Sequence, residues 1–202
     1  VVGIASIFWG SKGYADTVIS VADFGLKPDT RENAVAYVQK AIEACRGKEP
    51  VTLVFPEGRY DFWPQYAHEK NYYETNTYDV FPKRLAMLFE GLHNITVDGN
   101  GSQFIMHDRI QPITVENCDG VTLKNFSIDW DIPLTAQARV TKVGSDFFEI
   151  EINVLESPYI IEDGKLVFVG EGWKSALGSM IEFESDTHFV VPGTGDLVLG
   201  RN

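Results

Sequence analysis

Two acidic residues in the middle of the chain, Asp129 and Asp131, have the spacing of a possible catalytic pair. Glycoside hydrolysis needs one carboxylic acid to protonate the leaving oxygen and one carboxylate to activate water or to attack. Residues i and i+2 of a strand share a face, with α-carbons roughly 6.5–7 Å apart, and an inverting hydrolase needs carboxyl groups roughly 6.5–9.5 Å apart. The pattern permits such a pair, with Trp130 packed inside. The alternatives are solvated carboxylates or caps of the turn before Pro133.

Aromatic and polar residues are concentrated around the segment from Pro64 to Pro82, which contains Tyr66, Tyr72, Tyr73 and Tyr78. Sugars present apolar C–H faces that stack on such rings, and a tyrosine adds a polar tip. A long loop of this composition could form the wall of a binding groove or could pack over neighbouring strands. Further along the chain, Arg109 could bind a carboxylate or sugar hydroxyls, or it could form a structural ion pair. The candidate substrate-binding residues are Trp63, His68, Glu69, Arg109, Asp129 and Asp131.

The four histidines, His68, His93, His107 and His188, have no zinc-ligand spacing, so the sequence predicts no metal site. No nucleophile-elbow motif and no phosphate-binding loop occurs either. The sequence therefore predicts no cofactor.

The chain of 202 residues has the composition of a globular protein, with 44% hydrophobic and 23% charged residues. Its formal net charge of -12 and the absence of a basic stripe argue against a nucleic-acid partner. A neutral glycan or oligosaccharide is the expected partner. Neither the oligomeric state nor the exact glycan linkage can be predicted from the sequence.

An apolar run from Val1 to Trp9 is followed by the small residues Gly13 and Ala15. The run is too short for a membrane span, which needs roughly 20 apolar residues. We interpret residues 1–15 as the remnant of a signal peptide, or alternatively as an N-terminal strand. The first interpretation predicts an exported bacterial protein that is periplasmic, outer-membrane-associated or extracellular.

The next segment predicts a strand at Val18–Val21, a helix over 30–46 and a strand at Val51–Phe55. Asp29 and Glu32 have the spacing of a capping box, and apolar residues recur at helical spacing after them. We expect this helix to cover the open end of a stack of strands, since an uncovered first turn would expose unpaired backbone.

An internal repeat follows, in which residues 88–99 align with residues 114–125 at an offset of 26. The repeat predicts that Ile95 stacks on Val121 and Val97 on Leu123, as apolar ladders inside a right-handed parallel β-helix. The segment Phe104–Met106 further resembles Phe126–Ile128 after a variable corner. A β-sandwich with coincidental similarity is the alternative.

After Pro133, Ala138–Val143 and Phe147–Ile152 alternate around a turn and predict an antiparallel hairpin, with a further strand at Lys165–Val169. The predicted fold is therefore mostly β: a parallel β-helix with a capping helix and a small antiparallel insertion. The predicted division is the signal-peptide remnant at 1–15, the cap and first coils at 16–133, the insertion (a hairpin or small barrel) at 134–174, and a return to the β-helix at 175–202.

Cys45 and Cys118 are the only cysteines. An exported protein could pair them. Because Cys45 falls on the predicted helix face and Cys118 replaces Leu92 in the repeat, two buried free thiols are the favoured interpretation.

Several segments together resemble a known family. Val21–Gly25 before a helix resembles the opening of many pectate-lyase-like β-helix enzymes. The order of Phe62-Trp63-Pro64, Asn94–Ser102 and Lys124–Asp131 before a β insertion is similar to glycoside hydrolase family 110, bacterial exo-α-1,3-galactosidases. The resemblance covers roughly residues 18–153.

This resemblance implies hydrolysis of terminal α-1,3-linked galactose with inversion, without a metal or other cofactor. It also implies that the main catalytic carboxylates lie on later coils beyond Asn202, which leaves Asp129 and Asp131 as weak catalytic candidates. Two alternatives use the same scaffold: a polysaccharide lyase or polygalacturonase, against which the scattered basic residues argue, and a non-catalytic carbohydrate-binding protein.

Overall fold

The computed structural model describes residues 17–72, 82–194 and 197–198. Most of these residues lie in strands, and α1 (Val35–Cys45) is the α-helix of this described part. A short 3-10 helix covers Val21–Phe24. The strands are β1 (Thr17–Ser20), β2 (Val51–Val54), β3 (Arg59–Phe62), β4 (His68–Lys70), β5 (Lys83–Glu90), β6 (His93–Met106), β7 (Gln111–Glu116), β8 (Asp119–Trp130), β9 (Arg139–Val143), β10 (Phe148–Glu151), β11 (Tyr159–Glu162), β12 (Lys165–Gly170), β13 (Trp173–Ala176), β14 (Ser179–Met180) and β15 (Leu197–Val198).

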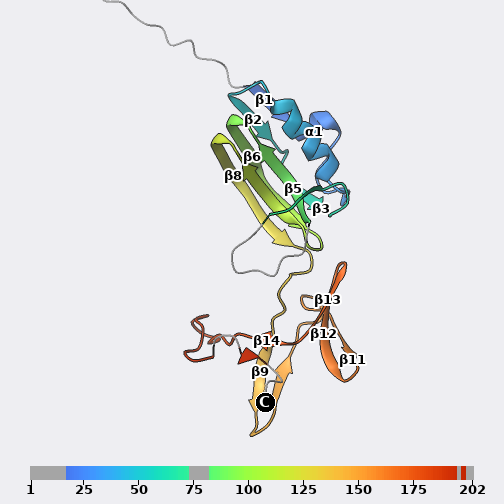
Figure 1. The fold of residues 1–202 in the computed structure, drawn as a ribbon, viewed down its shortest axis with the longest axis vertical. Helices are drawn as coiled ribbons and strands as arrows, with labels where there is room; N and C mark the ends of the chain where they lie inside the picture. Colours follow the sequence, from blue (N-terminus) through green and yellow to red (C-terminus); the bar gives the residue numbers. More distant parts are fainter. Residues whose placement is uncertain (1–16, 73–81, 195–196, 199–202) are drawn as a thin grey trace, which may run out of the picture.

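Parallel strands stack side by side in the order β1, β2, β6 and β8 (Figure 1). The predicted ladders are confirmed, because Ile95 lies opposite Val121 and Val97 opposite Leu123. The neighbouring pair β5 and β7 keeps the same offset, with Glu90 opposite Glu116. The internal repeat therefore corresponds to successive strands in parallel register. The prediction of a mostly β fold is confirmed.

One part of the predicted alignment is wrong. The register of β6 on β8 shifts at a bend, after which Ser102 lies opposite Phe126 and Phe104 opposite Ile128, an offset of 24 rather than 22. Phe104 and Phe126 are therefore not opposite each other in the ladder. Their rings are stacked in space, with centroids 4.8 Å apart, so the likeness reflects a diagonal packing contact.

The helix begins later than predicted. Asp29 and Glu32 do not form a capping box; instead the Asn33 side chain accepts a hydrogen bond from the backbone N–H of Val35 at 3.1 Å. The Asp29 carboxylate accepts from the backbone N–H of Arg59. The structure has a capping box at Ser20 and Asp23, around the 3-10 helix.

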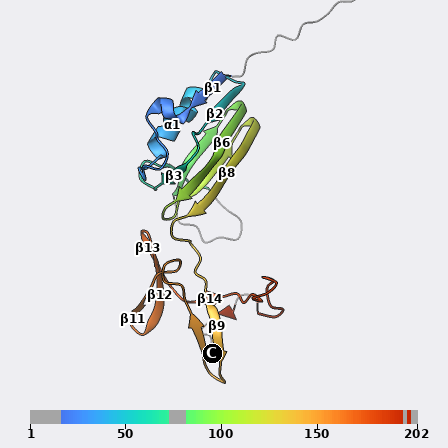
Figure 2. The same ribbon diagram turned by 180° about the vertical axis from the view of Figure 1, so that it is seen from behind.

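Helix α1 packs against β1, β2 and β5, at the β1 end of the stack (Figures 1 and 2). Its apolar side is fully buried, including Val35, Val38 and Cys45. The core continues into β5 and β6 through large side chains such as Phe89 and Phe104. The position at the first strand agrees with a covering role for this helix.

Both cysteines are free thiols, as favoured from the sequence, but only Cys45 is buried; the predicted burial of Cys118 is wrong, because this side chain is half-buried. Burial raises the pKa of the Cys45 thiol to about 11. Cys118 takes the place of Leu92 in the next repeat, and its sulfur accepts a hydrogen bond from the backbone N–H of Leu92 at 3.4 Å. The repeat therefore predicted the position of Cys118 correctly.

Beyond Pro133 the strands pair antiparallel: β9 with β10, β11 with β12, and β12 with β13. The predicted hairpin and the predicted strand near Lys165 are therefore confirmed. Strand β14 pairs antiparallel with β15. The predicted division into domains stays a prediction.

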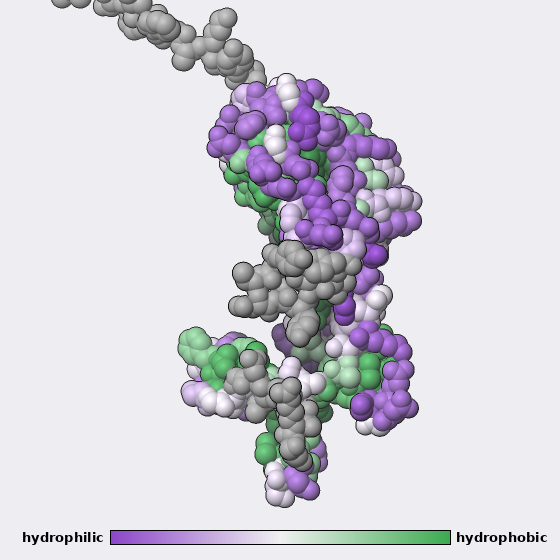
Figure 3. Space-filling view, viewed as in Figure 1, coloured by the Kyte–Doolittle hydropathy of each residue, from purple (hydrophilic) through white to green (hydrophobic). Residues whose placement is uncertain are grey.

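Hydrophobic side chains gather on the surface of this second part, whereas the surface over α1 and the parallel strands is largely hydrophilic in the same view (Figure 3). Among the exposed apolar residues are Leu155, Ile161 and Phe189. Across the described residues, we find no helix that is both long and apolar enough to cross a membrane. The signal-peptide interpretation concerns residues 1–15, which lie outside the described part.

Candidate functional site

A cluster of charged residues lies where three stacked strands end. Asp61 is in β3, His107 directly follows β6, and Asp131 directly follows β8. Phe62 lies opposite Met106, and Met106 opposite Trp130, so the register brings the three positions to one edge. Carboxylate and imidazole atoms of Asp61, His107 and Asp131 all lie within 4.8 Å of one another.

Arg59 joins the carboxylates of this cluster. Its Nη2 lies 2.5 Å from Oδ1 of Asp61 and 2.6 Å from Oδ1 of Asp131. Arg31 adds a second guanidinium, 3.7 Å from each of these oxygens. The hydrogen bond to Asp61 raises the pKa of Arg59, so this guanidinium stays charged.

The Asp61 side chain is fully buried. Burial alone would raise the pKa of this carboxyl group, but hydrogen bonds from Arg59 and His107 outweigh it and lower the pKa below 3.8. Asp61 is therefore a buried carboxylate that neighbouring cations keep ionised.

His107 bridges two carboxylates. Its Nε2 lies 2.9 Å from Asp61 Oδ1 and its Nδ1 lies 2.8 Å from Glu171 Oε2. Each ring nitrogen donates a hydrogen bond to its carboxylate when it carries hydrogen. The ring of Trp63 stacks on His107, with centroids 3.8 Å apart and an interplanar angle of 11°.

Glu171 belongs to the turn between β12 and β13, so the cluster joins the parallel strands to the antiparallel part. Glu171 also accepts from the backbone N–H of Asp108 at 3.3 Å. At the neighbouring Gly172, whose φ is 71°, an added Cβ would lie 2.5 Å from the Asp108 carboxylate. Trp130 donates from Nε1 to the carbonyl oxygen of Asp108 at 3.2 Å. The turn and the segment after β6 therefore fit closely against each other.

The candidate residues predicted from the sequence are distributed over four places. Trp63 and Asp131 lie in the charged cluster. Asp129 is exposed on β8, and its carboxylate accepts from the backbone N–H of Trp130 at 2.8 Å. Arg109 lies over the ring of Trp173, 5.9 Å from its centroid.

The other two candidates lie on β4, away from this cluster. Glu69 forms an ion pair with Arg84 at 3.5 Å, and His68 lines a hollow beside α1. The structure therefore brings together two of the six predicted residues, and the assignment of all six to substrate binding stays a prediction.

The cluster sets the guanidinium groups of Arg31 and Arg59 and the imidazole of His107 against the carboxylates of Asp61, Asp131 and Glu171. The two carboxylates and the imidazole of Asp61, Asp131 and His107 lie close enough to hold a metal ion, but the Arg59 guanidinium already contacts an oxygen of each aspartate. A carboxylate held this way is a poor proton donor or acceptor. The arrangement is suited to fastening segments together rather than to general acid–base catalysis.

Sequence reasoning missed Asp61, His107 and Glu171 as partners. Asp61 and His107 are 46 residues apart, and His107 and Glu171 are 64 apart. The repeat could have placed His107 beside Asp131, because both follow equivalent strands. No signal in the sequence links Glu171 to them.

A second charged group lies on the outer side of β5 and β7. Lys70 lies 2.7 Å from Glu90 and 2.8 Å from Glu116, which are stacked equivalents in the repeat. The hydroxyl of Tyr72 also donates to Glu116. Hydrogen bonds from Lys70 and then Tyr72 lower the pKa of Glu116. All acidic groups of this second cluster therefore have partners.

A protein-family model describes the second part of the chain. Residues 136–202 match the GLAA-B beta-barrel domain I. This match begins two residues after the start of the predicted insertion.

Curated relatives match nearly the whole chain. An alpha-1,3-galactosidase B of Bacteroides thetaiotaomicron is 61% identical over 182 residues, which are 90% of this chain and 30% of that protein. An alpha-1,3-galactosidase A of Shewanella woodyi is 35% identical over 169 residues, 83% of this chain and 28% of that protein. An alpha-1,3-galactosidase B of Akkermansia muciniphila is 29% identical over 186 residues, 92% of this chain and 23% of that protein.

The chain thus spans about 30% of the length of the first of these relatives. Aligned residues cover both the parallel strands and part of the antiparallel region, since they amount to 90% of the chain. The resemblance found in the sequence is confirmed: this chain is a homologue of proteins named alpha-1,3-galactosidase, and its residues 136–202 match the GLAA-B beta-barrel domain I.

Proposed function

We propose that this chain is part of an exo-acting, inverting α-1,3-galactosidase-like glycoside hydrolase that removes terminal α-linked galactose from glycans. The observation that carries the proposal is the 61% identity over 182 residues to a protein named alpha-1,3-galactosidase B. The acidic net charge of -12 suits a neutral glycan better than a polyanion.

The architecture that we propose for the complete enzyme is a right-handed parallel β-helix. Two features support it: β7 stacks on β5, and the first half of β8 on β6, in parallel register at an offset of 26 residues, and residues of positive φ interrupt both β6 (Asn100, Gly101) and β8 (Asn125) at equivalent positions. Leu123 and Ile128 of β8 are exposed, at 39% and 38%, where a further coil would cover them.

We further propose that the catalytic carboxylates lie outside this chain. Asp131 is held 2.6 Å from Arg59, and a carboxylate held in an ion pair with a guanidinium is a poor general acid. The Asp129 carboxylate accepts a hydrogen bond from the backbone N–H of Trp130. An inverting site needs one protonated and one ionised carboxyl group facing the same bond, and this pair does not supply that combination.

Galactose release tests the proposed activity. A longer polypeptide that contains this chain, at the length of its relatives, is incubated with an α-1,3-linked galactobiose, and the first-formed sugar is followed by proton NMR. We expect galactose to appear first as the β-anomer, because inversion changes the configuration of the α-linkage. No release, or release from galacturonides only, would overturn the proposal.

The same polypeptide tests the role of the acidic pair. We expect Asp129→Asn to lower kcat/KM for galactose release by no more than about tenfold, the effect of losing one hydrogen bond to the substrate. A loss of about a thousandfold, the size expected on removing a general acid or base, would instead place Asp129 in the catalytic machinery.

We propose, finally, that the protein is exported. The apolar run and the small residues at Gly13 and Ala15 support a signal peptide. Fractionation of the native bacterium with an antibody against the chain tests this: detection in the periplasm, at the outer membrane or in the medium supports export, and exclusive detection in the cytoplasm contradicts it.

A further inference from the structure

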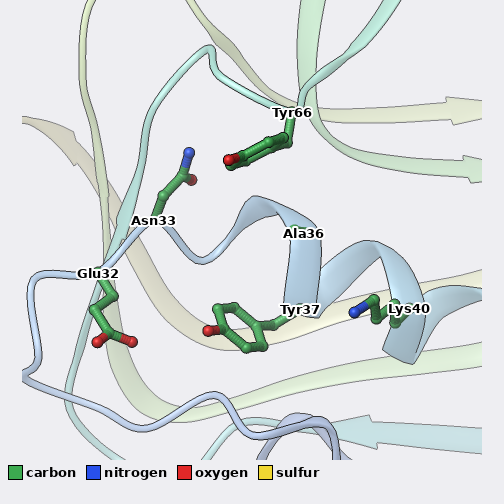
Figure 4. A pocket seen from close by; sticks show the side chains of 6 residues that line it. All are labelled: Glu32, Asn33, Ala36, Tyr37, Lys40 and Tyr66. Carbon is green, nitrogen blue, oxygen red and sulfur yellow. The ribbon is translucent and has the colours of Figure 1, made fainter.

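A groove runs along the outer side of α1, between this helix and the segment before β4 (Figure 4). It consists of two adjoining hollows of about 430 and 510 Å³, which share Ala36, Lys40 and Tyr66. Tyr37 lines the first hollow and His68 the second. Figure 4 shows the rings of Tyr37 and Tyr66 on opposite sides of the first hollow, with Asn33 and Glu32 at one end.

The backbone of Tyr66 is held in an unusual conformation that places its ring at this groove. Its φ is 68°, a left-handed value that costs free energy in a residue other than glycine. Two side chains stabilise the turn: Gln39 donates to the carbonyl oxygen of Tyr66 at 2.8 Å, and Asn33 donates to that of Gln65 at 2.8 Å. The Tyr66 side chain itself remains 64% exposed. The strained turn therefore holds the ring of Tyr66 at the groove, with most of the side chain exposed to solvent.

Several polar groups at the groove have no protein partner within the described ranges. They are the carboxylate of Glu32, the ammonium group of Lys40 and the hydroxyls of Tyr37 and Tyr66. Donors and acceptors thus line the groove together with two aromatic rings, which is the composition that a polyhydroxylated ligand requires.

We propose that this groove is a binding site for a neutral, galactose-bearing glycan, with a sugar ring against Tyr66 and Tyr37. The apolar C–H face of a hexose would cover the rings, and Glu32 and Lys40 would hydrogen-bond its hydroxyls. The Glu43 carboxylate at the second hollow is already paired with Arg46 at 3.2 Å, so the charges of Glu32 and Lys40 balance and the groove has no excess cation for an anionic uronate. The choice of galactose rests on the function proposed above; the site itself rests on the groove.

Binding to the complete 202-residue chain tests this proposal. The probes are α-1,3-linked galactobiose and, as the anionic comparison, sodium galacturonate, followed by isothermal titration calorimetry. We expect saturable binding of galactobiose with a Kd of about 1 mM, typical of a shallow site, and weaker binding of galacturonate.

Three tyrosine variants locate the site. We expect Tyr66→Ala to weaken binding at least about tenfold, because truncation of an aromatic anchor removes most of its contact energy. Tyr66→Phe keeps the ring and is expected to lose no more than about threefold, the effect of a single neutral hydrogen bond. The matched control is Tyr159→Ala, a tyrosine that is 40% exposed on β11 outside the groove; it is expected to bind like the parent.

The outcomes separate this site from the proposed activity. No saturable binding of galactobiose at about 10 mM, or binding that Tyr66→Ala leaves unchanged, overturns the site even if the longer polypeptide releases galactose. Binding that is lost in Tyr66→Ala supports the site even if no galactose is released. Stronger binding of galacturonate than of galactobiose overturns the assignment to a neutral glycan.

Discussion

At the scale of single residues, the buried carboxylate of Asp61 has the largest consequences. It accepts hydrogen bonds from Arg59 and His107 and has no contact with solvent. Removing one partner of a buried ion pair leaves the other charges uncompensated, which costs more than the pair itself contributes. The cluster therefore depends on Asp61 more than on the half-exposed Asp131.

The first prediction concerns this residue. Asp61→Asn keeps the shape of the side chain but removes its charge, so we expect a loss of about 3–5 kcal/mol in the free energy of unfolding. Urea unfolding followed by circular dichroism measures it. The control is Asp119→Asn, an exposed strand aspartate, which is expected to stay within about 0.5 kcal/mol of the parent. Equal effects of the two substitutions would contradict the central role of Asp61.

The second prediction concerns acid stability. The pKa of Asp61 is lower in the folded chain than its usual 3.8, so the unfolded chain takes up a proton before the folded one does. Asp61 therefore contributes stability above about pH 4, and this contribution is lost as the pH falls toward the folded pKa.

We expect the free energy of unfolding of the parent to decrease below about pH 4, and to decrease less steeply in Asp61→Asn. Urea titrations at several pH values measure both slopes. Some slope remains in the variant, because hydrogen bonds also lower the pKa values of Asp98 and Glu116. Parallel slopes in parent and variant would show that Asp61 does not contribute.

At this scale, the sequence pointed to individual members of the charged cluster but not to the residues that they contact. Trp63 and Asp131 were candidates and lie in one cluster, but as parts of an ion-pair network rather than as an open acidic pair. The partners Asp61, His107 and Glu171 come from separate elements, and short-range spacing carries no information about contacts 46 or 64 residues apart in the chain.

At the scale of elements, the bend in the middle of β6 determines how β8 packs on it. At Gly99, an added Cβ would lie 2.5 Å from Cβ of Phe126 and 2.7 Å from the carbonyl oxygen of Asn125. Both neighbours belong to the next strand of the stack, and one of them is backbone. A side chain at Gly99 would therefore push β8 away from β6.

The third prediction follows. We expect Gly99→Ala to destabilise the chain by about 1–3 kcal/mol through overpacking, measured by thermal or urea unfolding. The matched control is Gly178→Ala, where an added Cβ would meet only one atom, 3.9 Å away. If both alanine variants unfold alike, the close approach of Phe126 to Gly99 is not a constraint on the stack.

Element prediction succeeded where a periodic pattern extended over many residues. The strands of the repeat and the hairpin at Arg139–Glu151 were predicted from alternation and confirmed. The start of α1 was wrong, because Asp29 and Glu32 match a capping box in spacing but Asp29 is used to hold the backbone of Arg59. Local motifs compete with tertiary contacts, and here the tertiary contact prevailed.

At the scale of the whole molecule, β8 is the last strand of its sheet among the residues that the structure describes. One side of its backbone bonds to β6, and its inward-facing Leu123 and Ile128 are partly exposed. An uncovered edge of this length is a template for another strand. In the proposed β-helix, that strand is the next coil.

The fourth prediction tests this arrangement by hydrogen exchange. In the 202-residue chain, we expect the β8 amides that point away from β6 to exchange rapidly. In a polypeptide at the length of the relatives, we expect the same amides to exchange at least about tenfold more slowly, because a further strand would bond to them. The β6 amides serve as the internal control, since β6 has neighbours on both sides in the shorter chain. Identical exchange of β8 in both polypeptides would contradict a further coil on this edge.

The sequence was most informative at this largest scale. A repeat of 26 residues predicted which side chains stack, and the pairs Ile95–Val121 and Val97–Leu123 are as expected. It could not predict the fastening of the antiparallel part to the stack, because the contact of Glu171 with His107 depends on how two regions of different pairing meet.

The bend between Asp98 and Ser102 has a practical consequence for protein engineering. Three residues form it in β6, whereas Asn125 alone separates Lys124 from Phe126 in β8, and yet the strands on both sides of the bend stay in register. The scaffold thus already tolerates two different loop lengths at equivalent corners. A foreign peptide grafted beside the exposed Asn100 and Gly101 would project outward from such a corner while the ladders on either side stay aligned.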